Sequence, residues 1–441
     1  MEIPDRILIV GLGKTGVSVA RFLGGQGKAI TVTDTKTEAE LSHAIAELKG
    51  VEFKGRFGGH NTDDFINQDM IVVSPGVDIE MPYIKEAVKR GIRVIGEIEL
   101  ASAFVDSPII AITGTNGKTT VTSLMGEIFQ AAFEYVFVGG NIGNPLVNYV
   151  MDDKKADYVI LEISSFQLET IHRFHPHISV LLNITEDHLD RYRSFDEYRD
   201  AKLRIFENQS GDDFAILNKN IELNRPIKAK KLYFSAYDVV EEGAYYRDNK
   251  MYIRFNGKEY AYRRDISPLP GAHNTENLLV ALLAAHIAGI ERGVIEEVLK
   301  GFRGLPHRVE YVREINGVRF INDSKATNVD ATKRALQGIN DNIVLIAGGK
   351  DKGGSYRVMM DELKKVKALI LIGEARKRII GELAGHVVIY EAADLDDAVK
   401  RAMDVAKKGD TVLFSPMCSS FDMFRDYKER GEIFKKIVGA I

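Results

Sequence analysis

Short apolar runs alternate with helical patterns along almost the whole chain. The first run, residues 6–10, passes through a glycine-rich turn into a helical pattern that includes Phe22 and Leu23. Short β-branched runs separated by helices are typical of βαβ units, whose strands form parallel sheets. The pattern therefore predicts an α/β fold. The clearest strand patterns are residues 6–10, 30–33, 70–73, 109–113, 158–161, 179–182, 343–346, 368–372 and 411–414.

The same pattern divides the chain into three segments. A new series of strands opens at residue 109, and a long apolar helix follows Asn274 and stops around Gly289. The glycines and proline of residues 301–306 are typical of a linker, and a third series of strands follows them. The chain has 441 residues, more than one hydrophobic core usually supports. We predict three domains in series, which span residues 1–97, 98–304 and 305–441.

Composition narrows the class of protein. The formal net charge is −4 and both signs are mixed along the chain, so no surface for nucleic acid is expected. No apolar run reaches about eighteen residues, so no membrane span is expected. The N-terminus shows no secretory pattern, and the single cysteine, Cys418, suits a reducing compartment. We expect a cytoplasmic protein that works as a monomer.

Residues 113–120, Thr-Gly-Thr-Asn-Gly-Lys-Thr-Thr, have the pattern of a phosphate-binding loop. The segment follows an apolar strand and precedes a helical pattern, where loop N–H groups and the helix N-terminus can bind phosphate oxygens. Lys118 would contact the β- and γ-phosphates, and the Thr119 hydroxyl would ligate Mg²⁺. The usual motif has a further glycine where this chain has Ile112. The alternative is a glycine turn that only caps a helix, and the strand-to-helix junction favours the phosphate loop.

A second glycine loop, Gly11-x-Gly13-x-x-Gly16, follows the first strand. Asp34 ends the second strand, where dinucleotide-binding domains carry the carboxylate that binds a ribose hydroxyl. A tight turn between a strand and a helix would contain the same glycines. We expect a nucleotide diphosphate at this loop, and the loop does not distinguish NAD from a uridine diphosphate.

Acidic and histidine residues follow two strands of the middle segment. Glu162 ends one strand, and Asp187 and His188 follow another. Ligands of open α/β sheets lie beyond the carboxyl ends of the strands, so we expect these side chains to face the Lys118 loop. A carboxylate and an imidazole there could hold a second cation beside a transferring phosphoryl group. The alternatives are a surface cap for Glu162 and a structural role for His188.

Residues 195–206 have the pattern of an amphipathic helix, and Lys202 lies on it. By pattern alone, Lys202 is a solvent-exposed lysine, and nothing in the sequence by itself assigns it a chemical role. The candidate core residues of this helix are Phe195, Tyr198, Leu203 and Phe206.

Six motifs, in order along the chain, resemble those of the Mur ligases. The likeness extends from residue 6 to about residue 430, so it covers essentially the whole chain. Residues 162–169 and 322–328 are its most specific parts. The motifs are Gly-Thr-Asn-Gly-Lys-Thr at 114–119, Glu-Ile-Ser-Ser-Phe-Gln-Leu-Glu at 162–169, Asn-Ile-Thr-Glu-Asp-His-Leu-Asp at 183–190, His273-Asn274-x-x-Asn277, Leu-Pro-His-Arg at 305–308 and Asn-Asp-Ser-Lys-Ala-Thr-Asn at 322–328.

The resemblance implies a division of labour among the domains. A Rossmann-like N-terminal domain would bind the UDP-linked substrate, a P-loop-type mononucleotide-binding central domain would bind ATP, and a Rossmann-like C-terminal domain would bind D-glutamate. The implied UDP-substrate residues are Gly13, Lys14, Thr15, Asp34, Thr35, Ser74, Pro75, Gly76 and Asn141. The implied ATP-binding residues are Gly114, Thr115, Asn116, Gly117, Lys118, Thr119, Thr120, Asn274, Asn277, Arg308 and Asp323. The implied D-glutamate residues are Lys325, Thr327, Lys352, Ser420 and Tyr427.

The resemblance also implies a centre of two Mg²⁺ ions. Its residues would be Thr119, Glu162, His188 and Lys202, the last as a carbamate. Adding CO₂ turns the lysine cation into an anion, which adjacent Mg²⁺ would stabilise. The implied catalytic residues are Lys118, His188, Lys202 and Arg308. Two features of the D-glutamate pocket depart from the family pattern: residues 348–353 offer Lys350 as well as Lys352, and Tyr427 stands where phenylalanine is expected.

The implied reaction joins D-glutamate to UDP-N-acetylmuramoyl-L-alanine through an acyl phosphate made from ATP, in peptidoglycan precursor synthesis. The nearest alternatives are sister ligases and folylpolyglutamate synthetase, although the folate enzymes lack a UDP-binding N-terminal domain. A nicotinamide-dependent oxidoreductase would use the Gly11–Gly16 loop and leave the Lys118 loop unexplained. A non-catalytic nucleotide-binding switch would bind ATP and release no phosphate.

Overall fold

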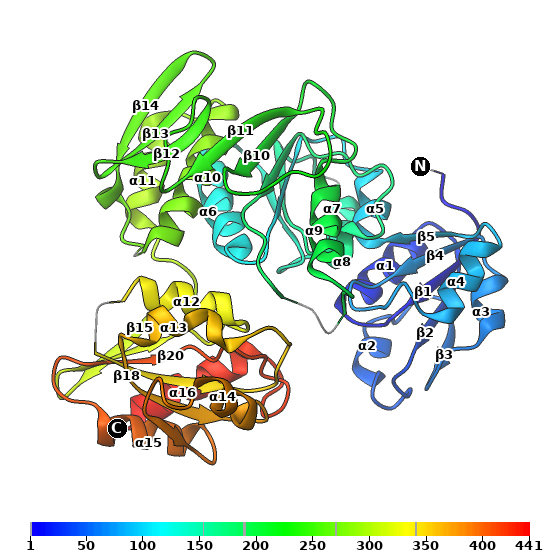
Figure 1. Cartoon of the computed structure of the whole chain (residues 1–441). Coiled ribbons are helices and arrows are strands. Elements are labelled where there is room, and N and C mark those ends of the chain that lie inside the picture. Colours follow the sequence, from blue (N-terminus) through cyan, green and yellow to red (C-terminus); the bar gives the residue numbers. More distant parts are fainter. Residues whose placement is uncertain (1, 153, 188–190, 270, 340–341) are drawn as a thin grey trace.

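The computed structural model describes residues 2–152, 154–187, 191–269, 271–339 and 342–441. These residues form three α/β domains in series, each with a sheet of its own (Figure 1). The blue N-terminal domain and the yellow-to-red C-terminal domain lie on different sides of the cyan-to-green middle domain. The predicted architecture is confirmed. The exact domain boundaries stay a prediction, although each sheet lies within one predicted segment.

The N-terminal domain has a parallel sheet with the strand order β3-β2-β1-β4-β5. Alternate residues of the central strand β1 belong to two separate apolar clusters, one on each face of the sheet. The strands are β1 (Arg6–Val10), β2 (Ala29–Asp34), β3 (Lys54–Phe57), β4 (Met70–Val73) and β5 (Arg93–Gly96). The helices are α1 (Lys14–Gly25), α2 (Ser42–Ala46), α3 (Thr62–Ile66), α4 (Pro82–Lys89) and α5 (Glu97–Ser102).

The middle domain has a larger sheet, with the order β14-β13-β12-β11-β10-β9-β6-β8-β7. The strand that precedes the predicted phosphate loop, β6, lies between β8 and β9 and is parallel to both. The strands are β6 (Ile109–Thr113), β7 (Val136–Gly140), β8 (Tyr158–Glu162), β9 (Ile178–Leu181), β10 (Phe214–Asn218), β11 (Lys230–Ser235), β12 (Gly243–Arg247), β13 (Lys250–Phe255) and β14 (Lys258–Arg263). The helices are α6 (Lys118–Ala132), α7 (Leu146–Met151), α8 (Ser165–Leu168), α9 (Phe195–Leu203), α10 (Ala272–Ile287) and α11 (Arg292–Gly301).

Helix α10 forms a large part of the middle-domain core. It packs against α6 and against the strands β11, β12 and β13, and every residue from Leu278 to Ala285 is buried. A helix that is apolar on all sides is stable only when other elements surround it. Each fully buried leucine contributes about 1.5–3 kcal/mol, so this segment anchors the domain.

The end of the middle sheet differs from the all-parallel pattern that the sequence suggested. The strands β12, β13 and β14 are antiparallel neighbours joined by two-residue turns. The turn residues Asp248, Asn249, Asn256 and Gly257 all have positive φ, between 49° and 71°. Asn, Asp and Gly tolerate this conformation, which type I′ hairpin turns require. These hairpins extend the sheet away from the phosphate loop.

The C-terminal domain has the strand order β15-β16-β20-β17-β18-β19, with β15 antiparallel to β16 and the other neighbours parallel. Apolar clusters cover both faces of this sheet. The strands are β15 (Glu310–Ile315), β16 (Val318–Asn322), β17 (Ile343–Gly348), β18 (Val366–Ile372), β19 (Ile389–Glu391) and β20 (Thr411–Phe414). The helices are α12 (Val329–Gln337), α13 (Met360–Leu363), α14 (Arg376–Leu383), α15 (Leu395–Val405) and α16 (Tyr427–Ala440).

Helix α5 joins the N-terminal and middle domains. The helix packs against α7, which also contacts α1. The buried carboxylate of Glu99 accepts hydrogen bonds from the peptide N–H groups of Arg173 and Phe174, at 3.0 Å each. On the other side of the middle domain, α12 is the helix of the C-terminal domain that faces it (Figure 1). Within the described ranges, no helix has the length and apolar character that crossing a membrane requires.

Candidate active site

The candidate site begins at the carboxyl ends of three neighbouring strands. Ile112 of β6 lies beside Glu162 of β8, and Thr113 lies beside Leu181 of β9. The phosphate loop, Glu162 and the segment that follows β9 therefore leave the sheet at the same edge. This convergence is the one that the sequence predicts, and it follows from the parallel pairing of the three strands.

The phosphate loop is a glycine-dependent turn between β6 and α6. Gly114 and Gly117 have φ values of 149° and 91°, which favour glycine. A side chain at Gly117 would place its Cβ 2.7 Å from Oδ1 of Asn277. The loop is held from outside by Asn183, which accepts a hydrogen bond from the Asn116 N–H at 2.8 Å and donates one to the Asn116 carbonyl at 2.9 Å. The strand-to-helix junction thus has the conformation of a phosphate loop.

Three of the predicted ATP-binding side chains in the loop point away from its concave side. The Thr115 hydroxyl lies 3.2 Å from the Tyr198 hydroxyl and accepts a hydrogen bond from the Thr185 N–H at 3.0 Å. Thr120 is buried within α6. The side chain of Asn116 donates to Asp330 of the C-terminal domain. The peptide N–H groups of Thr115 and Asn116 also donate to Asn183, at 2.9 Å and 2.8 Å, so both residues hold the loop in its conformation.

The ammonium group of Lys118 lies over the loop itself. It donates hydrogen bonds to the carbonyls of Gly114 at 2.8 Å and Thr115 at 2.9 Å. Burial lowers the pKa of Lys118, and the nearby carboxylates of Glu162 and Asp187 counteract that effect. Lys118 therefore lies where a phosphate group on the loop would meet it.

Lys202 lies in the interior of the domain, next to Lys118. Only 1% of its surface is exposed, and its ammonium donates to the Gly114 carbonyl at 3.0 Å and lies 4.5 Å from the centre of the Tyr198 ring. Burial, followed by the charge of Lys118, lowers the pKa of Lys202 well below its usual range. The sequence pattern, which favoured an exposed lysine, was wrong here because the face of α9 that carries Lys202 packs against the phosphate loop.

Glu162 has the properties of a cation ligand. It is 2% exposed, and its Oε1 accepts a hydrogen bond from the Asn141 side chain at 2.8 Å. Its other oxygen, Oε2, is buried and has no hydrogen-bond partner among the described residues. A buried, half-satisfied carboxylate is costly unless a cation completes its environment, so this oxygen fits a Mg²⁺ ligand. The predicted ligand His188 lies outside the described residues.

A pocket between the middle and C-terminal domains is lined by five of the eleven residues predicted to bind ATP. It is lined by Asn116, Gly117 and Asn277 on one side and by Arg308, Asp323 and Lys325 on the other. Asn277 donates to the Asn274 side chain at 3.1 Å, and both residues are buried in the first turns of α10. The structure thus brings the predicted base, ribose and phosphate residues to one pocket.

Asp323 is a buried charge in that pocket, and Arg308 beside it is half-buried. Burial lowers the pKa of Arg308, and its Nε has no hydrogen-bond partner within the described ranges. Burial raises the pKa of Asp323 to about 7, although Ser415 donates to it at 2.7 Å. A half-buried guanidinium with a buried, unused donor is suited to a phosphate group.

The predicted amino-acid residues fall into two groups in the C-terminal domain. The Lys325 ammonium lies 4.1 Å from the centre of the Tyr427 ring, and burial lowers the pKa of Lys325 to about 8. Lys352 forms an ion pair with Asp187 of the middle domain at 3.7 Å. Lys350 is exposed, so its side chain is the less suitable of the two lysines of this loop. Ser420 is buried and Thr327 is half-buried.

The glycine loop of the N-terminal domain is shaped by Asp34. Its carboxylate accepts hydrogen bonds from the N–H groups of Leu12 at 2.7 Å and Lys36 at 2.9 Å. A side chain at Gly16 would place its Cβ 2.0 Å from the Gly11 carbonyl, which the Ser74 hydroxyl also contacts. Asp34 therefore holds the loop through backbone groups, and its role toward a ribose stays a prediction.

The residues predicted to bind the UDP-linked substrate belong to two domains, the N-terminal domain and the middle domain. Lys14 donates to the carbonyl of Gly143, two residues from Asn141 in the middle domain. Thr15 follows Lys14 in the first turn of α1, and Gly13 stands at the N-cap of that helix. Thr35, Pro75 and Gly76 lie in exposed or half-exposed loops near the ends of β2 and β4.

Arg191, which the sequence did not single out as a candidate, connects the middle domain to the N-terminal domain. Arg191 donates to the carbonyls of Gly76 at 3.3 Å and Val77 at 2.8 Å in the N-terminal domain. It also donates to Glu169 at 3.1 Å and lies over the Phe166 ring at 4.3 Å. In the sequence, Arg191 directly follows the 183–190 motif, and this position could have identified it as a candidate site residue. The domain contact that gives it a role is visible only in the structure.

The fold and this arrangement define a three-domain protein with a phosphate loop, buried charged groups beside it and a second domain across the pocket. Models of three Mur ligase domains match the chain in order. The Mur ligase MurD-like N-terminal domain matches residues 5–96, the Mur ligase middle domain residues 112–285, and the Mur ligase glutamate ligase domain residues 307–418. The chain belongs to the Mur ligase family.

Full-length relatives are similar to this chain. The UDP-N-acetylmuramoylalanine–D-glutamate ligase of Geotalea daltonii is 47% identical over 448 residues, which cover 100% of this chain and 99% of the relative. The ligase of the same name from Geobacter metallireducens is 47% identical over 447 residues, with 100% and 99% covered. The structure of MurF ligase from Thermotoga maritima in complex with ADP has a TM-score of 0.62 at 15% identity and covers 93% of this chain and 95% of its own. That structural likeness shows the shared fold.

Proposed function

We propose that this chain uses ATP to add D-glutamate to UDP-N-acetylmuramoyl-L-alanine in peptidoglycan precursor synthesis. Relatives that carry the corresponding name match along their whole length. One structural observation carries the proposal. A cavity is lined by Thr119 and Asn141 of the middle domain and by Arg308, Lys325 and Tyr427 of the C-terminal domain. Groups suited to a phosphate, an acyl substrate and an amino acid therefore face the same space.

The first step transfers a phosphoryl group. An oxygen of the alanine carboxylate attacks the γ-phosphorus of ATP, ADP leaves, and an acyl phosphate forms. Lys118 would contact the β- and γ-phosphates from the loop. Arg308 lines both the nucleotide pocket and the cavity beyond it, so its guanidinium would hold the γ-phosphoryl group at their junction. Positioning and charge neutralisation supply most of the rate in such reactions.

The second step forms the amide. The nitrogen of D-glutamate attacks the acyl carbon and loses a proton, and inorganic phosphate leaves. Lys325 and Lys352 offer two cations for a dicarboxylate, and Thr327 and Ser420 offer hydroxyls. The Tyr427 ring holds the Lys325 ammonium at its face, a role that phenylalanine could also fill.

Residues of the middle domain would hold Mg²⁺ beside the loop. We infer that Thr119, Oε2 of Glu162 and Lys202 as a carbamate provide ligands, with His188 as a further one. Mg²⁺ would neutralise charge on the phosphates. The buried Lys202 amine supports this inference, because a lysine whose pKa is lowered is neutral, and reactive toward CO₂, at a lower pH than a free lysine.

A phosphate-release assay tests the function. The protein is mixed with ATP, Mg²⁺ and UDP-N-acetylmuramoyl-L-alanine, and a panel of D- and L-amino acids is added. Release should be greatest with D-glutamate and absent in Lys118→Ala, whereas Lys155→Ala, at an exposed position of the same domain, should behave as the wild type. If another amino acid gives the greatest release, the specificity is wrong and the ligase class survives. If Lys118→Ala turns over normally, the phosphate-loop assignment is wrong.

A further inference from the structure

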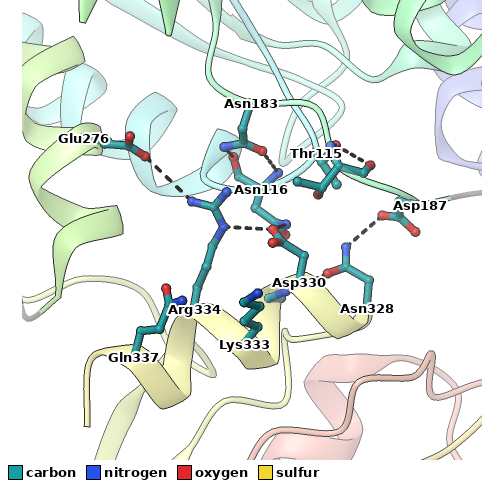
Figure 2. Close-up of polar contacts among 12 residues, drawn as sticks. Thr115, Asn116, Asn183, Asp187, Glu276, Asn328, Asp330, Lys333, Arg334 and Gln337 are labelled. Carbon is teal, nitrogen blue, oxygen red and sulfur yellow. Dashed lines mark hydrogen bonds and ion pairs between the residues drawn. The ribbon is translucent and has the colours of Figure 1, made fainter. Parts of the chain in front are cut away.

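A side chain of the phosphate loop is engaged by the C-terminal domain. The backbone of Asn116 is fixed by Asn183, so its side chain is left free to point out of the loop. Its amide donates to Oδ2 of Asp330 at 2.7 Å, across 214 residues of sequence (Figure 2). Asp330 lies in the first turn of α12, in the C-terminal domain. The contact therefore joins the loop that faces ATP to the domain that carries the amino-acid residues.

The acceptor oxygen is held in place by a second interaction. Arg334, one turn further along α12, donates to the same Oδ2 of Asp330 at 2.8 Å and pairs with Glu276 of the middle domain at 3.7 Å (Figure 2). Burial lowers the pKa of Arg334, but Asp330 and Glu276 raise it by more, so it lies above the usual range. Glu276 in turn accepts from Asn218 at 3.1 Å. A partly buried chain of alternating donors and acceptors thus crosses the domain boundary twice.

The cap of α12 makes a parallel contact. Oδ1 of Asn328 accepts a hydrogen bond from the Ala331 N–H at 2.8 Å and so caps the helix. The amide of the same side chain donates to Asp187 of the middle domain at 2.9 Å (Figure 2). Asp187 also pairs with Lys352. The start of α12 is therefore held against the middle domain at two points, Asn328 and Asp330.

We propose that Asp330 is a positioning residue that docks the C-terminal domain onto the phosphate loop through Asn116. Lys325 and Thr327 lie a few residues before α12, so docking this helix sets their distance from the loop. This inference rests on the proposed function for the identity of the substrates, but the docking contact itself does not depend on which amino acid is used. A charge-assisted hydrogen bond within a partly buried network is strong enough to bias a movement between domains.

The distance between the domains tests the docking directly. The one native cysteine, Cys418, is buried, so cysteines introduced by Lys258→Cys and Lys377→Cys, at exposed sites in the middle and C-terminal domains, can carry a fluorescent donor and acceptor. With an ATP analogue bound, Asp330→Ala should show a longer or broader distance distribution than the otherwise unchanged labelled protein. Gln337→Ala is the matched control, because Gln337 is on the same helix and its amide donates to Glu362 within the C-terminal domain. Equal distributions in Asp330→Ala and its parent would overturn the proposal.

Kinetics test whether the two residues act through one contact. Asp330→Ala should raise KM for D-glutamate about tenfold, the factor that one charge-assisted hydrogen bond supplies. Asn116→Ala combined with Asp330→Ala should be no worse than the more affected single variant, because both changes remove the same bond. Effects that multiply would show that Asp330 acts elsewhere. Asp330→Asn keeps the shape of the side chain and an acceptor oxygen, so its KM for D-glutamate should fall between those of the wild type and Asp330→Ala. This variant also provides the test if Asp330→Ala folds poorly.

The failure of this inference can be distinguished from the failure of the proposed function. A wild-type protein that binds no ATP analogue would reject the proposed function, whereas normal docking in Asp330→Ala rejects only this inference.

Discussion

Lys202 shows how far the environment of one residue changes its chemistry. Its ammonium is enclosed by the Gly114 carbonyl, the Tyr198 ring and the charge of Lys118. In water, such a lysine would be protonated at neutral pH and would not react with CO₂. Inside the domain its pKa is lowered, so the neutral amine is present at lower pH. The buried position therefore makes the modification that we propose chemically accessible.

We expect Lys202→Arg to lose activity about a hundredfold or more, because arginine keeps the positive charge and cannot form a carbamate. Wild-type protein equilibrated with isotopically labelled CO₂ should show a carbamate carbon resonance at neutral pH, and this signal should be absent in Lys202→Arg. Below the lowered pKa the amine is protonated, so both signal and activity should decline toward acid pH. A full carbamate signal in the variant would assign the modification to another lysine.

At the scale of elements, α5 determines how the first two domains meet. Two buried glutamates on this short helix serve different neighbours. Glu99 accepts several peptide N–H groups of the segment that follows α8, whereas Oε1 of Glu97 accepts the Val147 N–H at 2.7 Å. The other oxygen of Glu97 has no hydrogen-bond partner in the described part of the chain. Burial consequently raises the pKa of Glu97 to about 7.

This pKa predicts a dependence of stability on pH. The folded protein binds the Glu97 proton more tightly than the unfolded chain does, where glutamate has a pKa of about 4.3. The stabilising contribution is therefore complete below that value and is lost as pH rises through about 7. The loss is at most about 4 kcal/mol.

Urea unfolding at pH 5 and pH 8 measures this effect, with both pH values chosen at about the two ends of the titration range. Wild type should lose stability relative to Glu97→Gln as the pH rises, because glutamine does not ionise. Glu99→Gln is the comparison on the same helix, and it should lose stability at both pH values because its hydrogen bonds to the peptide N–H groups are weakened. Wild type and Glu97→Gln that respond to pH in parallel would contradict the prediction.

At the level of the whole molecule, each domain would supply part of the proposed site. The phosphate loop and Glu162 belong to the middle domain, Arg308 and Lys325 to the C-terminal domain, and the Gly11–Gly16 loop to the N-terminal domain. The N-terminal and middle domains pack together through α5 and α7. Further contacts across the boundaries are made by single polar side chains, among them Lys14, Arg191, Asn328 and Asp330. Such contacts can be made and lost as the domains move, which is how ligases of several domains enclose substrates.

Arg191 should matter for the UDP-linked substrate more than for ATP. Its guanidinium holds the backbone of Gly76 and Val77, next to the predicted substrate loop. Arg191→Lys removes the planar fork while keeping the charge, so KM for the UDP substrate should rise about tenfold with KM for ATP nearly unchanged. Arg193→Ala is the control, because Arg193 is 75% exposed and its pairing with Glu80 at 3.6 Å should contribute little. Equal changes in both KM values would show that Arg191 supports the fold and not substrate binding.

Local patterns in the sequence were sufficient to predict the three-domain α/β architecture and the phosphate loop. Central strands such as β1, β6 and β17 are apolar without interruption, and α10 is apolar on all sides, so each could be recognised from local pattern. The loop at 113–120 was also recognisable, because its glycines are required by local backbone geometry. Both kinds of signal depend on residues that are neighbours along the chain.

The burial of charged residues and the contacts between domains could be seen only in the folded structure. The sequence pattern of α9 could not show that Lys202 packs under the phosphate loop. Whether a face of a helix is buried depends on which other elements pack against it in the folded protein. The hydrogen bond between Asn116 and Asp330 joins residues far apart in sequence, and neither residue type predicts the other. Desolvation and contacts between domains depend on distances in space, so the electrostatics of this site and its assembly from three domains emerge only when the chain is folded.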